Sequence, residues 1–171
     1  MIDPSIYRQL ADLEERLRRL EALEAEAFVG ARYTSNAAQS IPNATYTVVD
    51  YEDIDYDPLG LVTTGAAWVF TCPIAGRYLV TAAALFDASA AWSATEVARF
   101  DVYQNGAVAA VLDFYTAEAS GVNQYVRMGG SEIVECNAGD TLQVRIYQST
   151  GGVLPLINLT EHNHIAVARV G

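Results

Sequence analysis

Two different periods of hydrophobic positions divide the chain into an N-terminal helix and a longer β region. Over residues 5–27, apolar side chains recur at alternating spacings of four and three, which is the heptad rhythm of a coiled coil. From residue 41 onward, short apolar or alternating runs recur instead, separated by Gly, Asn, Asp and Pro. Residues 29–40 have no sustained period and predict a linker. We therefore expect a helix over 1–28, this linker, and a β domain over 41–171.

The N-terminal pattern predicts an oligomerising helix. Asp3 can cap its first turn, and Pro4 suits the first helical position. The alternative is a single amphipathic helix that lies on its own domain, but such a helix shows a broader apolar face. About three heptads are marginal alone, so a second contact between subunits must support them. The expected trimerisation stripe consists of Ile6, Leu10, Leu13, Leu17 and Leu20.

The β region predicts about eight to ten strands and no second helix. Asn105-Gly106 predicts a tight hairpin because both positions tolerate positive φ, and Gly129-Gly130 predicts a bulge or a break. Many short strands close most simply as an antiparallel sandwich of the jelly-roll kind. The expected strands are 46–49, 66–72, 77–86, 96–103, 108–115, 122–128, 131–136, 141–148 and 163–170. Core positions, with a subunit interface as the alternative, are expected for Trp68, Phe70, Tyr78, Phe86, Phe100, Tyr103 and Tyr147.

Composition narrows the classes of partner. Hydrophobic residues make up 51% of the 171, which is enough for a real core and excludes disorder for most of the chain. The chain has 21 acidic and 10 basic residues, a net charge of −11, which argues against binding to nucleic acid or to an anionic membrane. No apolar run is long enough for a transmembrane helix, and the N-terminus lacks the basic-then-apolar pattern of a signal peptide.

Four segments of the β region follow one another in a specific order: VFTCPIAGRYLV (69–80), VYQNG (102–106), SEIVEC (131–136) and AGDTLQV (138–144). In these segments the β region resembles the globular domain of the C1q and tumour-necrosis-factor superfamily. This resemblance implies an all-β, ten-stranded antiparallel jelly roll that assembles as a homotrimer at the end of a stalk, here a short α-helical coiled coil. The chain differs from the animal members because it has no signal peptide, no collagen-like repeat and no Lys. In these respects it looks more like the C1q-like modules of bacteria and bacteriophages.

The plan of a short helix and a trimeric β head is similar to that of phage fibre and head-decoration proteins. The resemblance therefore implies a non-enzymatic structural or adhesion protein on the virion surface, in capsid decoration, a head fibre or host attachment. Its partners would be other virion proteins or a host-surface protein or glycan. The alternative is a secreted or surface-displayed bacterial module that binds carbohydrate or protein. No Gly-rich phosphate loop, Gly-x-Ser-x-Gly or His-Glu-x-x-His motif appears, which argues against an enzyme.

Two groups of residues are candidate metal ligands. The run 50–57 holds five acidic residues in eight, and the oxygens of Asp53, Asp55 and Asp57 suit Ca²⁺. The competing interpretation is a solvated acidic loop, or an edge strand that its charges protect from pairing. His162 and His164 would share one face of a strand and could hold a transition metal on a threefold axis, or they could be ordinary surface residues. No other cofactor is indicated.

Cys72 and Cys136 are the only cysteines. If the resemblance holds, each ends a strand at the same end of the sandwich, so a disulfide is geometrically open to them. The competing interpretation is a pair of buried free thiols in a protein made in a reducing cytoplasm.

Overall fold

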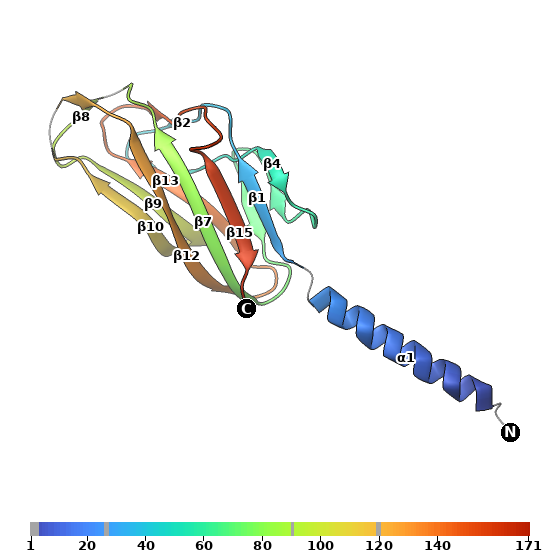
Figure 1. Ribbon diagram of the computed structural model, residues 1–171. Coiled ribbons are helices and arrows are strands. Elements are labelled where there is room, and N and C mark those ends of the chain that lie inside the picture. The colour runs from blue at the N-terminus through green and yellow to red at the C-terminus, as the bar shows by residue number, and fades with distance from the viewer. Residues whose placement is uncertain (1–3, 26–27, 90, 119–120) are drawn as a thin grey trace.

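A computed structural model describes residues 4–25, 28–89, 91–118 and 121–171. Its one helix, α1 (Pro4–Ala25), projects from one end of a two-sheet sandwich, beside the C-terminus (Figure 1). The helix begins at Pro4, as the sequence predicts, whereas the expected cap Asp3 lies outside the described residues. The chain therefore consists of a helical stalk and a β head.

Two antiparallel sheets form the head. Sheet I has the order β12-β7-β15-β1-β4, and sheet II has the order β10-β9-β13-β6-β5 with β3 beside β13. The short pairs β8–β11 and β2–β14 complete the strands, so the predicted antiparallel jelly-roll sandwich is confirmed. The strands are β1 (Gly30–Thr34), β2 (Ser40–Ile41), β3 (Thr47–Val48), β4 (Asp53–Tyr56), β5 (Val62–Thr63), β6 (Val69–Thr71), β7 (Gly76–Phe86), β8 (Ala91–Trp92), β9 (Val97–Gln104), β10 (Ala107–Thr116), β11 (Val122–Asn123), β12 (Val126–Cys136), β13 (Thr141–Gln148), β14 (Leu154–Pro155) and β15 (His164–Arg169).

Aromatic rings fill the space between the sheets. The rings of Tyr33 and Tyr51 meet Trp68 edge-on, with centroids 6.1 and 6.0 Å away. Such perpendicular pairs add to the stability that burial of the rings already provides. Five of the seven expected core residues lie in this layer: Trp68, Phe70, Tyr78, Phe86 and Phe100. Tyr103 is buried as well, but on the outward face of sheet II, where Tyr46 and Arg145 pack on its ring, and Tyr147 is half-buried on the same face.

The structure differs from the expected linker over residues 29–40. Residues 30–34 form β1, which lies between β15 and β4 in sheet I. Ala31 and Tyr33 point into the core and Arg32 points outward, so the strand has the ordinary alternation of a half-buried strand. Five residues with Gly at one end and Thr at the other are too short a pattern to stand out from a small, polar stretch.

The two glycine turns have opposite outcomes. The Asn105-Gly106 hairpin is confirmed, with φ of 51° and 82° at its two residues. At Gly129-Gly130 the structure has neither a bulge nor a break, because β12 pairs with β7 without a register shift. The glycines serve a close approach instead. A Cβ on Gly130 would lie 2.5 Å from the carbonyl oxygen of Leu112 in β10.

Candidate functional site

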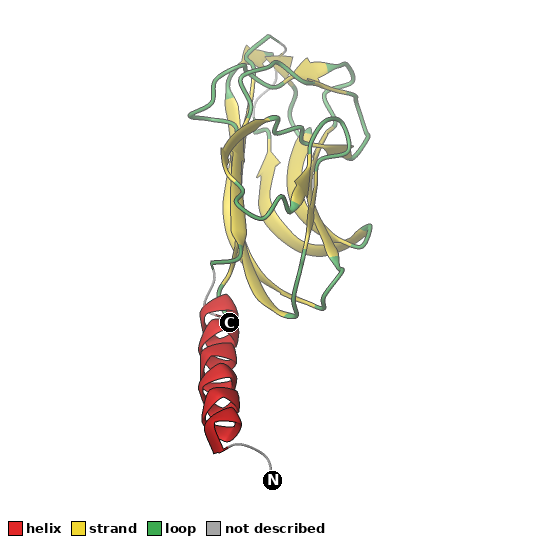
Figure 2. Cartoon of the chain, turned by 90° about the vertical axis from the view of Figure 1, so that its right-hand side faces the viewer, coloured by secondary structure: helices red, strands yellow, loops and turns green. Residues whose placement is uncertain are grey.

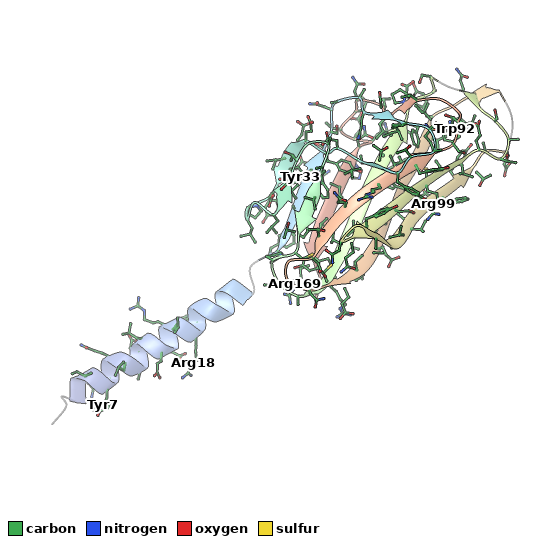
Figure 3. All side chains as sticks on the ribbon, turned by 180° about the vertical axis from the view of Figure 1, so that it is seen from behind. Tyr7, Arg18, Tyr33, Trp92, Arg99 and Arg169 are labelled. Atoms are coloured by element: carbon green, nitrogen blue, oxygen red, sulfur yellow. The ribbon has the colours of Figure 1, made fainter. Side chains whose placement is uncertain are left out.

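The helix has no partner within the described part of the chain. It extends away from both sheets, and Tyr7 and Arg18 point into open space (Figures 2 and 3). This placement does not fit the alternative of a helix that lies on its own domain. The side chain of Leu20 lies outside the described part. The rest of the expected stripe is exposed: Ile6 by 45%, Leu10 by 51%, Leu13 by 58% and Leu17 by 57%.

The three middle rows of the outward face of sheet I carry mostly uncharged side chains, and the rows that flank them hold Arg127 beside Leu85 and Glu135 beside Arg77. The register of β12, β7, β15 and β1 aligns these side chains in rows across the sheet. One row holds Gly129, Ala83, His164 and Thr34; the next holds Ser131, Thr81, Ala166 and Arg32; the third holds Ile133, Leu79, Ala168 and Gly30. A face this flat and weakly charged is suited to contact with another protein surface.

A hollow of about 210 Å³ interrupts this face above Gly129 and Ala83. It is open because glycine and alanine fill so little of their row, while Arg127 and His164 also line it. The hydroxyls of Thr81 and Ser131 lie 2.8 Å apart beside it.

The electrostatics of the hollow favour anions. Burial lowers the pKa of His164, and the positive charges of Arg32 and Arg127 lower it further. The Arg32 guanidinium is 3.1 Å from the Asp55 carboxylate, whereas Arg127 has no salt bridge among the described residues. Two nearby guanidinium groups disfavour the transition metal that the sequence suggested at His164.

A second candidate surface runs along the neighbouring edges of β10 and β12. Val108, Val111 and Phe114 on β10 are 50%, 49% and 55% exposed, and Ile133 on β12 is 53% exposed. The Asp113 carboxylate holds the two edges together by accepting a hydrogen bond from the backbone N–H of Gly129 at 3.0 Å. The result is an apolar ridge on a rigid support, and we call it the β10/β12 ridge.

The outward face of sheet II is covered by its own side chains. The Arg145 guanidinium lies 4.2 Å from the centroid of the Tyr103 ring. Tyr46 packs on Tyr147 with ring centroids 4.9 Å apart. The buried Asp101 carboxylate is paired with Arg99 at 3.1 Å, although burial raises its pKa. The side chains of this Tyr/Arg cluster cover one another, although the Nε atoms of Arg99 and Arg145 have no hydrogen-bond partner among the described residues.

The three carboxylates expected to bind calcium make three separate structural contacts. Asp53 and Asp55 lie on β4, and Asp57 lies in the turn that follows. No group of three His, Cys, Asp or Glu residues that could hold a metal occurs in the described part of the chain. Asp53 accepts the N–H of Asn36 at 3.2 Å, Asp55 pairs with Arg32, and Asp57 accepts the Tyr33 hydroxyl at 2.8 Å and the N–H groups of Leu61 and Val62.

The two histidines do not lie on one strand. His164 begins β15, but His162 lies in the preceding turn, where its N–H donates to the Leu159 carbonyl at 3.1 Å. The residue between them, Asn163, is buried and closes the turn by accepting the N–H of Leu85 at 3.1 Å. Sequence reasoning missed this role, since a lone Asn between histidines carries no signal of burial.

Cys72 and Cys136 are buried and lie close enough for each to influence the pKa of the other, and the Cys136 thiol donates a hydrogen bond to the Val134 carbonyl at 3.9 Å. Burial raises the pKa of both, so neither thiol is an activated nucleophile. Cys72 directly follows β6 of sheet II, and Cys136 ends β12 of sheet I. They are therefore placed at the same end of the sandwich, although both are free thiols in the structure.

The hollow itself could not be found from the sequence. Its residues come from β7, β12 and β15, and the register that brings them together is not visible in any local pattern. The exposed β10 residues carried a partial signal, because residues 107–111 are all Ala or Val, so this part of the strand has no polar face.

Comparison with known proteins bears on the fold. No protein-family model and no curated protein matches the chain. Among solved structures, the Eiger TNF of S. frugiperda superposes with a TM-score of 0.63 at 14% identity, over 84% of this chain and 93% of that one. The fold is the TNF/C1q jelly roll. Murine APRIL matches with a TM-score of 0.56 at 12% identity, covering 84% of this chain and 99% of its own.

A C1q globular domain also matches the structure. The globular domain of zebrafish complement 1qA matches the jelly roll with a TM-score of 0.54 at 12% identity, over 83% of this chain and 97% of that one. No helix in the described part of the chain is long and apolar enough to cross a membrane. The expectation of a C1q/TNF-like jelly roll is confirmed at the level of fold.

Proposed function

We propose that the chain is a non-enzymatic homotrimer whose β head binds a partner and whose helix forms a three-stranded stalk. The observation that carries this proposal is the pairing of two unlike surfaces on one head. The β10/β12 ridge is apolar and exposed, and the outward face of sheet I is small and weakly charged. A ridge that docks on the unlike face of a neighbour makes a head-to-tail contact, and three such contacts can close a ring.

The stalk supports the same assembly. α1 leaves the head at the end where β1 begins, and its stripe is exposed. Three copies held together by their heads would bring three helices side by side. The local concentration of the stripes would then be high enough for a short coiled coil to form.

Light scattering on the full chain and on a chain that begins at Phe28 tests the trimer. The shorter chain keeps Val29, whose carbonyl accepts the N–H of Arg169 at 2.8 Å. We expect trimers of both, with the stalk adding stability. A trimer that becomes a monomer without the helix would assign assembly to Leu10, Leu13 and Leu17. A full-length monomer would overturn the proposal.

We propose further that the trimer is a virion surface protein of a bacteriophage, as a head fibre, decoration or host-attachment protein. The resemblance to phage modules and the stalk-and-head plan support this role. A rigid trimer that presents three weak sites gains avidity for a host-surface protein or glycan. The alternative is a secreted or surface-displayed bacterial module that binds carbohydrate or protein.

Immuno-electron microscopy separates the two roles. Antibody against the purified head is applied to particles and to cells of the strain that carries the gene. We expect label on particle surfaces. Label on the cell envelope instead would favour the bacterial module. The purified protein should correspondingly bind either empty capsids or immobilised glycans.

The contacts of the candidate residues weaken the metal hypotheses and favour the disulfide. Calcium at Asp53, Asp55 and Asp57 would have to compete with existing contacts of all three carboxylates, and a metal at His164 would face two guanidinium groups. A Ca²⁺ titration followed by thermal unfolding tests the first, and we expect no change in Tm. The disulfide between Cys72 and Cys136 is the stronger hypothesis, because the two thiols already lie close together.

A further inference from the structure

The hollow on sheet I has one unpaired positive charge, that of Arg127, on a strongly acidic protein, and the lowered pKa of His164 leaves its imidazole neutral near pH 7. The chain has a net charge of −11, yet Arg127, His164 and Arg32 lie near one another on this face. Asp55 neutralises Arg32, and no carboxylate among the described residues pairs with Arg127. The hollow therefore has an uncompensated guanidinium at its rim.

The other groups that line the hollow are suited to an oxygen-rich anion. The hydroxyls of Thr81 and Ser131 hydrogen-bond to each other, which leaves one O–H free to donate to an anion, while Gly129 and Ala83 leave the space for an incoming group. A guanidinium beside donor hydroxyls is a common setting for a carboxylate, because the guanidinium can offer two parallel N–H groups. The volume of about 210 Å³ is large enough for one acidic side chain.

The unpaired charge of Arg127 becomes important when the chain assembles with other copies. In the proposed head-to-tail trimer, the outward face of sheet I is covered by the β10/β12 ridge of a neighbour. Covering Arg127 without a counter-charge would be strongly unfavourable, since a desolvated charge needs a partner. A second copy offers such a partner, because Glu132 is exposed and directly precedes Ile133 of its ridge.

We propose that the hollow between Arg127 and His164 accepts a carboxylate side chain of a second copy of this chain and so fixes the register of the trimer. This inference rests on the proposed trimer and adds a contact between a carboxylate and Arg127 to the apolar contact of the ridge. The ridge supplies area, whereas the carboxylate in the hollow selects one docking position among several that a smooth apolar surface would allow.

The test compares Arg127→Gln with Arg127→Lys in the full chain. Gln removes the charge and Lys keeps it, and both retain a long side chain on an exposed residue, so folding should be unaffected. Sedimentation equilibrium gives the trimer dissociation constant of each variant in low and high salt. We expect Arg127→Gln to weaken the trimer by roughly tenfold in low salt and Arg127→Lys by less than about threefold. The difference should shrink in about 0.5 M salt, which screens charge pairs at the rim of a contact.

The outcomes separate the two proposals. A trimeric wild type whose dissociation constant is the same for Arg127→Gln, Arg127→Lys and both salt concentrations would overturn the carboxylate in the hollow and leave the trimer intact. A monomeric wild type would overturn both. Thermal unfolding of each variant confirms that any loss of trimer is not a loss of fold.

Discussion

The outward faces of the two sheets differ in what they leave unpartnered. On sheet II, Tyr46, Tyr103 and Tyr147 stack with one another and with two arginines, and the one buried carboxylate there is paired. On sheet I, the corresponding positions hold Gly, Ala, Ser and Thr, and an arginine lies unpaired at the rim of a hollow. The outward face of sheet II is covered by its own side chains, whereas the outward face of sheet I leaves a surface for a second chain to cover.

This difference indicates which side of the sandwich faces inward in an assembly. Large aromatic and arginine side chains that cover their own sheet need no subunit to exclude water. Small side chains in flat rows leave backbone and apolar atoms exposed, and they allow a neighbouring subunit to approach the sheet closely and cover them. The comparison therefore assigns sheet I to subunit contact, together with the β10 edge of sheet II that carries the ridge, and the Tyr/Arg cluster of sheet II to the outside of the trimer.

The largest effect on trimer stability is expected when charged side chains replace the apolar ones of the β10/β12 ridge. Val111→Glu combined with Phe114→Glu places two charges on the apolar ridge, and we expect the trimer dissociation constant to rise by roughly 100-fold or more. Light scattering over a dilution series measures this change. Val153→Glu is the matched control, because Val153 is 62% exposed and lies in a loop away from both surfaces. Equal masses for the double variant and the control would contradict the assignment of the ridge.

The next effect concerns the closure of the sandwich beneath the ridge. Gly130→Ala places a Cβ 2.5 Å from a backbone oxygen of β10, and this clash cannot be relieved by moving a side chain. We expect a loss of about 2–4 kcal/mol in the free energy of unfolding, measured by urea denaturation. Gly129→Ala is the control, since its new Cβ would be 3.2 Å from the nearest atom and should cost clearly less. Equal losses would mean that β10 and β12 do not approach as closely as described.

The sequence predicts the parts of this fold that depend on local pattern. α1 forms where the heptad pattern predicts a helix, and the Asn105-Gly106 hairpin forms because both residues accept positive φ. The long alternating strand β13 (Thr141–Gln148) has the same bounds as expected. Each of these elements is determined by residues that are neighbours in the chain.

The parts that were not predicted depend on contacts between distant segments. β1 is short, and its place in sheet I comes from pairing with β15, which is over 130 positions away. The Gly129-Gly130 pair has a local pattern typical of a break, but its real constraint is Leu112 on another strand. Arg127 and His164 become one site only through β7, which lies between their strands.

A third prediction concerns a disulfide that would link the two sheets covalently. Refolding the head with oxidised glutathione should join Cys72, which follows β6 of sheet II, to Cys136 of sheet I, and lower the mass by about 2 Da. A bridge that closes a loop of roughly 60 residues stabilises by about 4 kcal/mol, so we expect Tm to rise by roughly 10 °C. Cys72→Ser is the control and should show neither change. Two titratable thiols after oxidative refolding would show that the pair stays reduced.

The smallest expected effect is at the turn that follows Cys136. Hydrogen bonds from Asn105, from the backbone N–H of Asn137 and from Gln104 lower the pKa of the Asp140 carboxyl below its usual 3.8. A lowered folded-state pKa means that the ionised group stabilises the fold above the unfolded-state pKa, and that this stabilisation is lost as pH falls through the folded value.

Asp140→Asn should therefore have a lower Tm than the wild type at pH 7, and the difference should diminish as pH falls below 3.8. Thermal unfolding from pH 2 to pH 7 follows the difference, and Asp12→Asn on the exposed helix serves as a control that should leave it unchanged. A constant difference across this range would mean that Asp140 acts through shape alone. Because this turn lies on the edge shared by β9, β13 and β12, the result also shows whether polar contacts at the rim help the apolar core to hold the two sheets in register.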